Sequence, residues 1–157
     1  MKLLLFILSF LCFASNIEAQ ELPSPILFIY DASGSMWGQM DGKTKKQIAS
    51  EVLITTVGKL PENQSIGLIA YGHRKTSDCD DIEYLVNLTN DSKANITNAV
   101  KKLNPTGKTP LARSAILAIN SLKQNKTKAT IILITDGIES CDGDICKVIT
   151  DAKANGI

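Results

Sequence analysis

The sequence predicts an α/β fold with a mostly parallel sheet flanked by helices. Apolar runs typical of buried strands alternate along the chain with amphipathic helical segments, and this alternation is characteristic of parallel sheets. The two strongest strands are expected at 26–30 and 130–135, and each runs directly into an aspartate. The 157 residues, 44% of them hydrophobic, are enough for one domain with a core and too few for a second domain of ordinary size.

The remaining elements follow from the hydrophobic pattern, which recurs every three or four residues in helices and forms short apolar runs in strands. In chain order we expect a strand at 26–30, an exposed turn at 36–42, a helix at 43–57, a strand at 65–71, a polar loop at 72–81, a strand at 82–88, helices at 91–103 and 110–122, a strand at 130–135 and a helix at 144–154. The first helix is expected to pack through Ile48, Val52 and Leu53. The strand at 82–88 is short and mixed in pattern, which predicts an edge position.

Residues 1–19 have the features of an export signal. Lys2 precedes a 12-residue apolar core, and the residues before Gln20 resemble a cleavage site. Twelve residues are too few to cross ~30 Å of hydrocarbon, although an uncleaved anchor is the alternative. We therefore divide the chain into a signal peptide at 1–19 and a domain at 20–157. We expect a periplasmic, secreted or cell-surface protein, and we expect no transmembrane segment in residues 20–157. The chain ends where a loop into another strand is expected, so we interpret the domain as C-terminally incomplete.

Export would allow disulfides among Cys79, Cys141 and Cys146. Three cysteines permit three single pairings, and each leaves one thiol over. Cys141 and Cys146 lie close together in a loop-like stretch, which favours a bridge between them. A zinc site is the weaker alternative, because the chain has no C-x-x-C pattern and His73 is its only histidine.

Three oxygen side chains follow the first strand at alternate positions, on Asp31, Ser33 and Ser35. One carboxylate with two neutral hydroxyls is a hard and incomplete ligand set that suits Mg²⁺ or Mn²⁺. Ligands of open α/β sheets bind at the carboxyl ends of the strands, and Asp136 ends the strand at 130–135. Thr109 enters the same edge from a loop, although a threonine at this position is also a good helix N-cap.

Together these residues resemble the von Willebrand factor type A domain and its metal-ion-dependent adhesion site. The resemblance extends to 107–111 and 133–137, and the stretches 71–74 and 139–146 with Cys79 are similar to exported bacterial members. It implies a Rossmann-like sheet whose last strands and helix this chain lacks. It also implies that Mg²⁺, with Mn²⁺ or Ca²⁺ as alternatives, is held by hydroxyls and by direct or water-mediated carboxylates, from Asp31, Ser33, Ser35, Thr109 and Asp136.

The resemblance implies that the remaining position on the cation takes an acidic group of a protein or glycan partner, which makes the domain an adhesion or protein-interaction module. Met36 and Trp37 lie just past the motif and are candidate apolar anchors for this contact, with packing against the following helix as the alternative. His73 is a third candidate for partner binding.

Other function classes fit the sequence less well. The net charge is +1 with no basic block, which argues against nucleic acid. The stretch at 107–109 lacks phosphate-loop spacing, and a Ser35–His73–Asp136 hydrolase lacks the G-x-S-x-G elbow. A metal-assisted hydrolase would need a general base, for which His73 is the only obvious candidate. We therefore expect no enzymatic activity. A structural module with an empty site is the other alternative, disfavoured because all five ligand positions hold competent residues.

Overall fold

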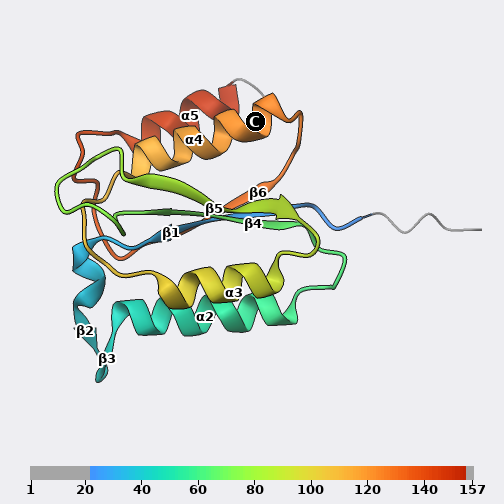
Figure 1. The fold of residues 1–157 in the computed structure, drawn as a ribbon. Helices are drawn as coiled ribbons and strands as arrows, with labels where there is room; N and C mark the ends of the chain where they lie inside the picture. Colours follow the sequence, from blue (N-terminus) through green and yellow to red (C-terminus); the bar gives the residue numbers. More distant parts are fainter. Residues whose placement is uncertain (1–21, 155–157) are drawn as a thin grey trace, which may run out of the picture.

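The computed structural model describes residues 22–154, and the predicted signal peptide lies outside the described residues. A four-stranded sheet lies between two layers of helices (Figure 1). The elements are β1 (Ile26–Asp31), the 3-10 helix η1 (Gly34–Trp37), β2 (Gln39–Met40), β3 (Lys43–Thr44), α2 (Lys45–Lys59), β4 (Ile66–Tyr71), β5 (Ile82–Thr89), α3 (Lys93–Lys102), α4 (Leu111–Gln124), β6 (Thr130–Ile134) and α5 (Ile145–Ala154). The predicted fold class, a mostly parallel sheet flanked by helices, is confirmed.

The strand order of the sheet is β5-β4-β1-β6, so β1 is central. It pairs in parallel with both β4 and β6. Because side chains alternate across a strand, β1 feeds two core layers. Phe28 and Tyr30 pack toward α2 and α3, whereas Leu27 and Ile29 pack toward α4. The two layers bury both faces of β1, as its continuous apolar run predicts.

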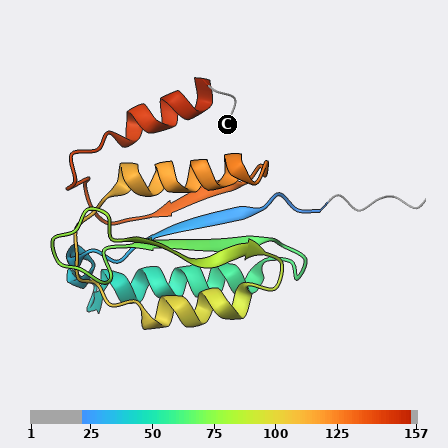
Figure 2. The same cartoon turned by 45° about the horizontal axis from the view of Figure 1, so that its top comes forward.

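The edges of the sheet differ. β5 pairs antiparallel with β4 and has register shifts, and its edge position is the predicted one. β6 forms the other edge and pairs only with β1 in the described chain. Figure 2 shows α5 on the outer side of α4, farther from the sheet, and none of the residues of α5 is buried. No helix within residues 22–154 combines the length and apolar character needed to span a membrane.

The buried face of α2 includes the predicted Leu53 but not the predicted Val52. It consists of Ser50, Leu53 and Val57, whereas Val52 is 59% exposed. Ser50 is accommodated on this face by a polar contact, since the hydroxyl oxygens of Tyr30 and Ser50 lie 2.9 Å apart. The hydrogen bond satisfies both buried hydroxyls, and Leu53 and Val57 pack into the core beside it.

The predicted exposed turn at 36–42 contains more structure than expected. η1 is followed by a two-stranded hairpin of β2 and β3. Its turn residues Asp41 and Gly42 both have positive φ, as a tight hairpin turn requires. Met36 is only 1% exposed and belongs to the core cluster with Tyr30 and Leu53. Met36 as a partner anchor is therefore wrong, because η1 directs its side chain into the core.

Candidate metal site

The first predicted ligand, Asp31, ends β1 inside the protein and is 0% exposed. Its Oδ1 accepts a hydrogen bond from the Ser33 amide at 2.8 Å, and its Oδ2 accepts one from Thr135 Oγ1 at 2.7 Å. Both donors are neutral. Among residues 22–154, no lysine, arginine or histidine forms an ion pair with Asp31. A buried charge without a counter-ion is costly, so this position favours a cation.

The two serines connect β1 to the loop after β6. Ser33 is 1% exposed, and its Oγ lies 3.0 Å from the Oγ of the exposed Ser35. Ser35 Oγ donates a hydrogen bond to Asp136 Oδ1 at 2.7 Å. The chain segments carrying these groups are 101 residues apart, and the parallel pairing of β1 with β6 brings them to one edge.

Thr109 reaches the same place from a third segment. A Cβ built at Gly137 would lie 3.5 Å from Ser35 Oγ and 3.7 Å from Thr109 Oγ1, so both hydroxyls face this glycine. The structure thus brings all five predicted ligand residues to one edge of the sheet. Position 137 therefore lies in van der Waals contact with the two hydroxyl-bearing side chains.

The alternative role of Thr109 as a helix cap is not realised. α4 begins at Leu111 without a side-chain cap from the preceding residues. Glu139, from the loop after β6, accepts from the Ala112 amide at 2.8 Å and from the Cys141 amide at 2.7 Å. A carboxylate at a helix N-terminus is electrostatically favourable. Sequence reasoning missed this role of Glu139, and its distance along the chain from α4 gives no local signal.

Backbone contacts hold the three segments together. The Gly72 carbonyl accepts hydrogen bonds from the amides of Thr106 at 3.0 Å and Gly107 at 2.7 Å, and the Gly107 carbonyl accepts one from Gly34 at 3.0 Å. Gly72 has φ +69°, and a Cβ there would lie 3.0 Å from the Ser33 Cα. The positive φ and the close backbone approach both require glycine at position 72.

Tyr71 supports the site from β4. Its hydroxyl donates to Thr135 Oγ1 at 3.3 Å, and Thr135 in turn donates to Asp31. Burial raises the pKa of the Tyr71 phenol, and the negative charge of Asp31 raises it further. Tyr71 therefore remains a protonated donor and fixes the hydroxyl that orients Asp31.

The donor set tests which cation would fit. Within the described residues no three or more His, Cys, Asp or Glu side chains are arranged so that they could hold a metal ion, so the zinc alternative has no site there. Two carboxylates and three hydroxyls are hard oxygen donors, which suit Mg²⁺ or Mn²⁺. The buried charge of Asp31 points the same way, and the residues present therefore fit a small divalent cation.

Lys45 is an additional charged group that the sequence reasoning missed. Its Nζ lies 2.6 Å from Asp136 Oδ2. Lys45 is the first residue of α2 and directly follows the N-cap Thr44. A lysine is unfavourable at the positive end of a helix. That mismatch is a signal that could have predicted a nearby anion.

Comparison with known proteins decides the family. The family model described as the von Willebrand factor type A domain matches residues 26–139. The chain belongs to this family. Members of the family are typically adhesion or protein-interaction modules.

Three similar proteins show the range of the match. The uncharacterized protein YwmC of Bacillus subtilis is 27% identical over 165 residues, which cover 98% of this chain and 73% of YwmC. BatB of Bacteroides thetaiotaomicron has a TM-score of 0.68 at 23% identity, over 86% of this chain and 63% of BatB. Manganese-loaded TRAP of Plasmodium vivax has a TM-score of 0.60 at 17% identity, over 87% of this chain and 55% of TRAP. At these identities the two solved structures establish the fold alone.

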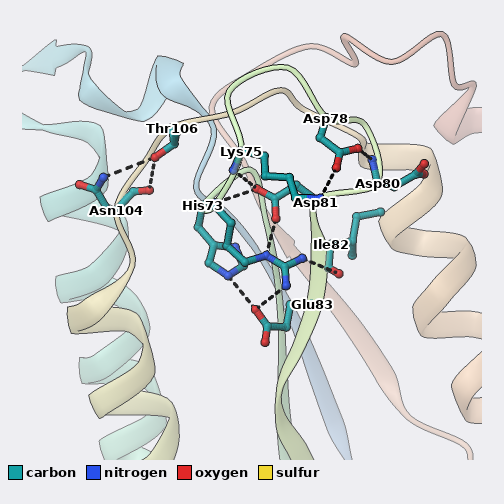
Figure 3. Close-up of polar contacts among 10 residues, drawn as sticks. His73, Lys75, Asp78, Asp80, Asp81, Ile82, Glu83, Asn104 and Thr106 are labelled. Carbon is teal, nitrogen blue, oxygen red and sulfur yellow. Dashed lines mark hydrogen bonds and ion pairs between the residues drawn. The ribbon is translucent and has the colours of Figure 1, made fainter.

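In this von Willebrand factor type A domain, hydrogen bonds and ion pairs among its own residues fix the conformation of the loop after β4 (Figure 3). Asp81 is 0% exposed, and its Oδ2 accepts from the amides of Arg74 at 2.7 Å and Lys75 at 2.9 Å. Its Oδ1 accepts from Arg74 Nε at 2.6 Å. Although burial raises the pKa of Asp81, the hydrogen bonds from Arg74 and Lys75 bring it below its usual value. This network makes the loop a structural element.

His73 belongs to that loop and not to the ligand set. Its Nε2 lies 3.0 Å from Glu83 Oε2, and 11% of the side chain is exposed. Figure 3 shows the imidazole directed toward Glu83. Within the described structure no hydrogen bond joins His73 to Ser35 or Asp136, so the Ser–His–Asp arrangement is not assembled. Its predicted part in partner binding remains a prediction, with little exposed surface to support it.

The predicted disulfide between Cys141 and Cys146 is wrong. Cys141 pairs with Cys79, 62 residues away, and Cys146 is free and exposed. The reason is the geometry of the loop after β6. Cys141 is 5% exposed and meets the loop after β4, whereas Cys146 lies in the first turn of α5. The bridge therefore ties together the two loops that border the site.

Large apolar side chains border the site on the surface. Trp37 is 51% exposed, and its indole nitrogen donates to the Pro105 carbonyl at 2.9 Å. Ile138, two residues after Asp136, is 88% exposed. Sequence reasoning missed Ile138, although an isoleucine in a polar loop two residues after a candidate ligand is a usable signal.

Proposed function

We propose that this domain binds a divalent cation, Mg²⁺ with Mn²⁺ or Ca²⁺ as alternatives, and through it an acidic group of a protein or glycan partner. The observation that carries the proposal is the charge of Asp31, which is fully buried with only neutral hydrogen-bond donors. A bound cation would offset this charge. The manganese-loaded state of TRAP, a protein of the same fold, is consistent with this.

The residues that would hold the cation are the three hydroxyls and two carboxylates at the edge of the sheet, namely Asp31, Ser33, Ser35, Thr109 and Asp136. A divalent cation with few charged ligands stays electropositive. It would supply an attraction for a carboxylate that the partner provides. Because these donors are fixed by the fold, the partner would complete a preformed site.

The exposed apolar residues beside the site support a protein partner. Trp37 is anchored through its indole nitrogen while half of its surface remains exposed. Ile138 follows Asp136 by two residues and is almost fully exposed. Exposed aromatic and aliphatic side chains commonly serve as anchors in interaction sites. We propose Trp37 and Ile138 as the apolar contacts of the partner.

Export to the periplasm, the cell surface or the medium is part of the proposal. A disulfide such as Cys79–Cys141 persists in oxidising compartments. The charged and apolar pattern of residues 1–19 is that of an export signal. Both features support the same location.

The test is calorimetric titration with Mg²⁺ and with Mn²⁺. Thr109→Val is the sharpest variant, because valine keeps the shape of threonine and Thr109 does not cap α4. Thr106→Val, in the same loop, is the matched control, since its hydroxyl donates to the Asn104 carbonyl. We expect one site in the wild type, an affinity lower by about tenfold or more in Thr109→Val, and no change in Thr106→Val. No binding to folded wild-type protein would contradict the proposal.

The second candidate is an interaction module that works without metal. The contact of Lys45 with Asp136 favours it, because this carboxylate already has a counter-ion. The same titration separates the two candidates, since a metal-independent module would bind neither cation.

A further inference from the structure

Lys45 is the charged group at the site that the ligand set does not account for. Its ammonium contacts Asp136 Oδ2 at 2.6 Å, while Asp136 Oδ1 accepts from Ser35. The side chains of Lys45 and Asp136 are 34% and 11% exposed. The ion pair is therefore largely shielded from solvent, and it involves one of the five candidate ligands.

The path of the Lys45 side chain is built into the fold. The Lys45 amide donates to the Gly38 carbonyl at 2.9 Å. A Cβ built at Gly38 would lie 3.2 Å from Lys45 Cε and 3.6 Å from Cδ. The hydrocarbon part of Lys45 thus lies over a glycine on its way to Asp136. Of the two lysines that begin α2, Lys45 forms an ion pair with Asp136, whereas Lys46 forms no ion pair within the described residues.

Lys45 changes the net formal charge of the candidate metal site. With Asp31 and Asp136 ionised, the ammonium leaves the cation-free site with one net negative charge. A divalent cation would convert this to one net positive charge. Without Lys45 the loaded site would be neutral and would attract a carboxylate less strongly.

We propose that Lys45 is an internal counter-ion that competes with the divalent cation for Asp136, and that it leaves the loaded site cationic toward an acidic partner. The inference rests on the proposed metal site. Lys45 stabilises the cation-free protein and opposes the cation through like-charge repulsion. The domain therefore holds its metal less tightly than its ligands alone would allow, and a carboxylate that binds to the loaded site strengthens metal binding by linkage.

The experiment measures Mg²⁺ and Mn²⁺ affinity by calorimetry in the wild type, Lys45→Met, Lys45→Arg and Lys46→Met. Lys46→Met removes the same charge from the same helical turn and is the matched control. We expect Lys45→Met to bind either cation at least about tenfold more tightly than the wild type. Lys45→Arg, which keeps the charge, and Lys46→Met should stay within about twofold.

Thermal unfolding gives an independent readout. In chelator, Lys45→Met should unfold at a lower temperature than the wild type, and Mg²⁺ should raise its unfolding temperature by more. If the wild type binds the cation and Lys45→Met binds it with the same affinity, the inference about Lys45 is overturned while the metal site stands. If neither protein binds a cation, the proposed function fails and the inference fails with it.

Discussion

Two carboxylates of this domain are equally buried, but only one of them has a charged partner. Asp31 and Asp81 are both 0% exposed. Asp81 receives three hydrogen bonds, one of them from the charged guanidinium of Arg74. Asp31 receives two, both from neutral donors. Burial alone therefore does not distinguish the two carboxylates, whereas the presence or absence of a counter-ion does.

The largest expected effect comes from the disulfide that joins the loop after β4, which contains Asp81, to the loop after β6 beside the candidate site. Replacing Cys79 and Cys141 by alanine should lower the free energy of unfolding by about 2–4 kcal/mol, because the bridge closes a loop of 62 residues. Urea denaturation measures this change. Cys146→Ala, at the free exposed thiol, should change stability by less than about 0.5 kcal/mol. An equal effect of the two changes would argue against the Cys79–Cys141 bridge.

Asp81→Asn should destabilise the domain by about 2–3 kcal/mol, because it removes the charge that Arg74 and the two amides bind. The loss should be the same in Mg²⁺ and in chelator, since this network contains no predicted ligand. Asp80→Asn is the control, because the side chain of Asp80 is 80% exposed and its ion pair is worth little. A Mg²⁺-dependent loss in Asp81→Asn would mean that the two regions are coupled.

Asp31→Asn should behave in the opposite way. In chelator its stability should lie within about 1 kcal/mol of the wild type, because removing an uncompensated buried charge offsets the weaker hydrogen bonds. Saturating Mg²⁺, at 100 times the dissociation constant, should stabilise the wild type by about 2.7 kcal/mol and the variant not at all. Urea denaturation with and without Mg²⁺ measures both quantities. A loss in chelator as large as that of Asp81→Asn would make Asp31 a structural residue.

The pH dependence gives the smallest and most selective effect. The pKa of Asp81 is lowered in the folded protein, so its stabilising contribution is complete above the unfolded value of about 3.9. It is lost as the pH falls from there through the lowered folded pKa. The difference in unfolding free energy between the wild type and Asp81→Asn should therefore be constant from pH 5 to 7 and narrow below about pH 4. A difference that does not change with pH would contradict this assignment.

The fold could be predicted because its signals are local. β1 and β4 are buried on both faces, so their apolar runs are unbroken, and the helices α3, α4 and α5 carry apolar residues at helical spacing. The topology rule for parallel sheets then placed Asp31 and Asp136 at one edge before any contact was known. Thr109 is placed at the same edge by its position in a loop before a helix, and its role as a ligand follows from the family resemblance.

The errors concern contacts that depend on distant parts of the chain. Met36 reads as a surface residue after a polar motif, and only the turn of η1 puts it in the core. The proximity of Cys141 and Cys146 in the sequence favours the wrong disulfide, because the true partner Cys79 is brought near Cys141 by the packing of two loops. Glu139 and Lys45 each act on an element far along the chain. Such partners leave little trace in a single sequence.

The Cys79–Cys141 bridge also determines which of the candidate ligands a pulling force could separate. Thr109 and Asp136 lie inside the covalent ring that the bridge closes, whereas Asp31, Ser33 and Ser35 precede it. A pulling force applied to the N-terminal end of the domain would load β1, whose parallel hydrogen bonds to β4 and β6 would resist in shear. Extraction of β1 would separate the two halves of the site while the ring stayed closed. Release of a bound cation would then report the moment at which β1 leaves the sheet.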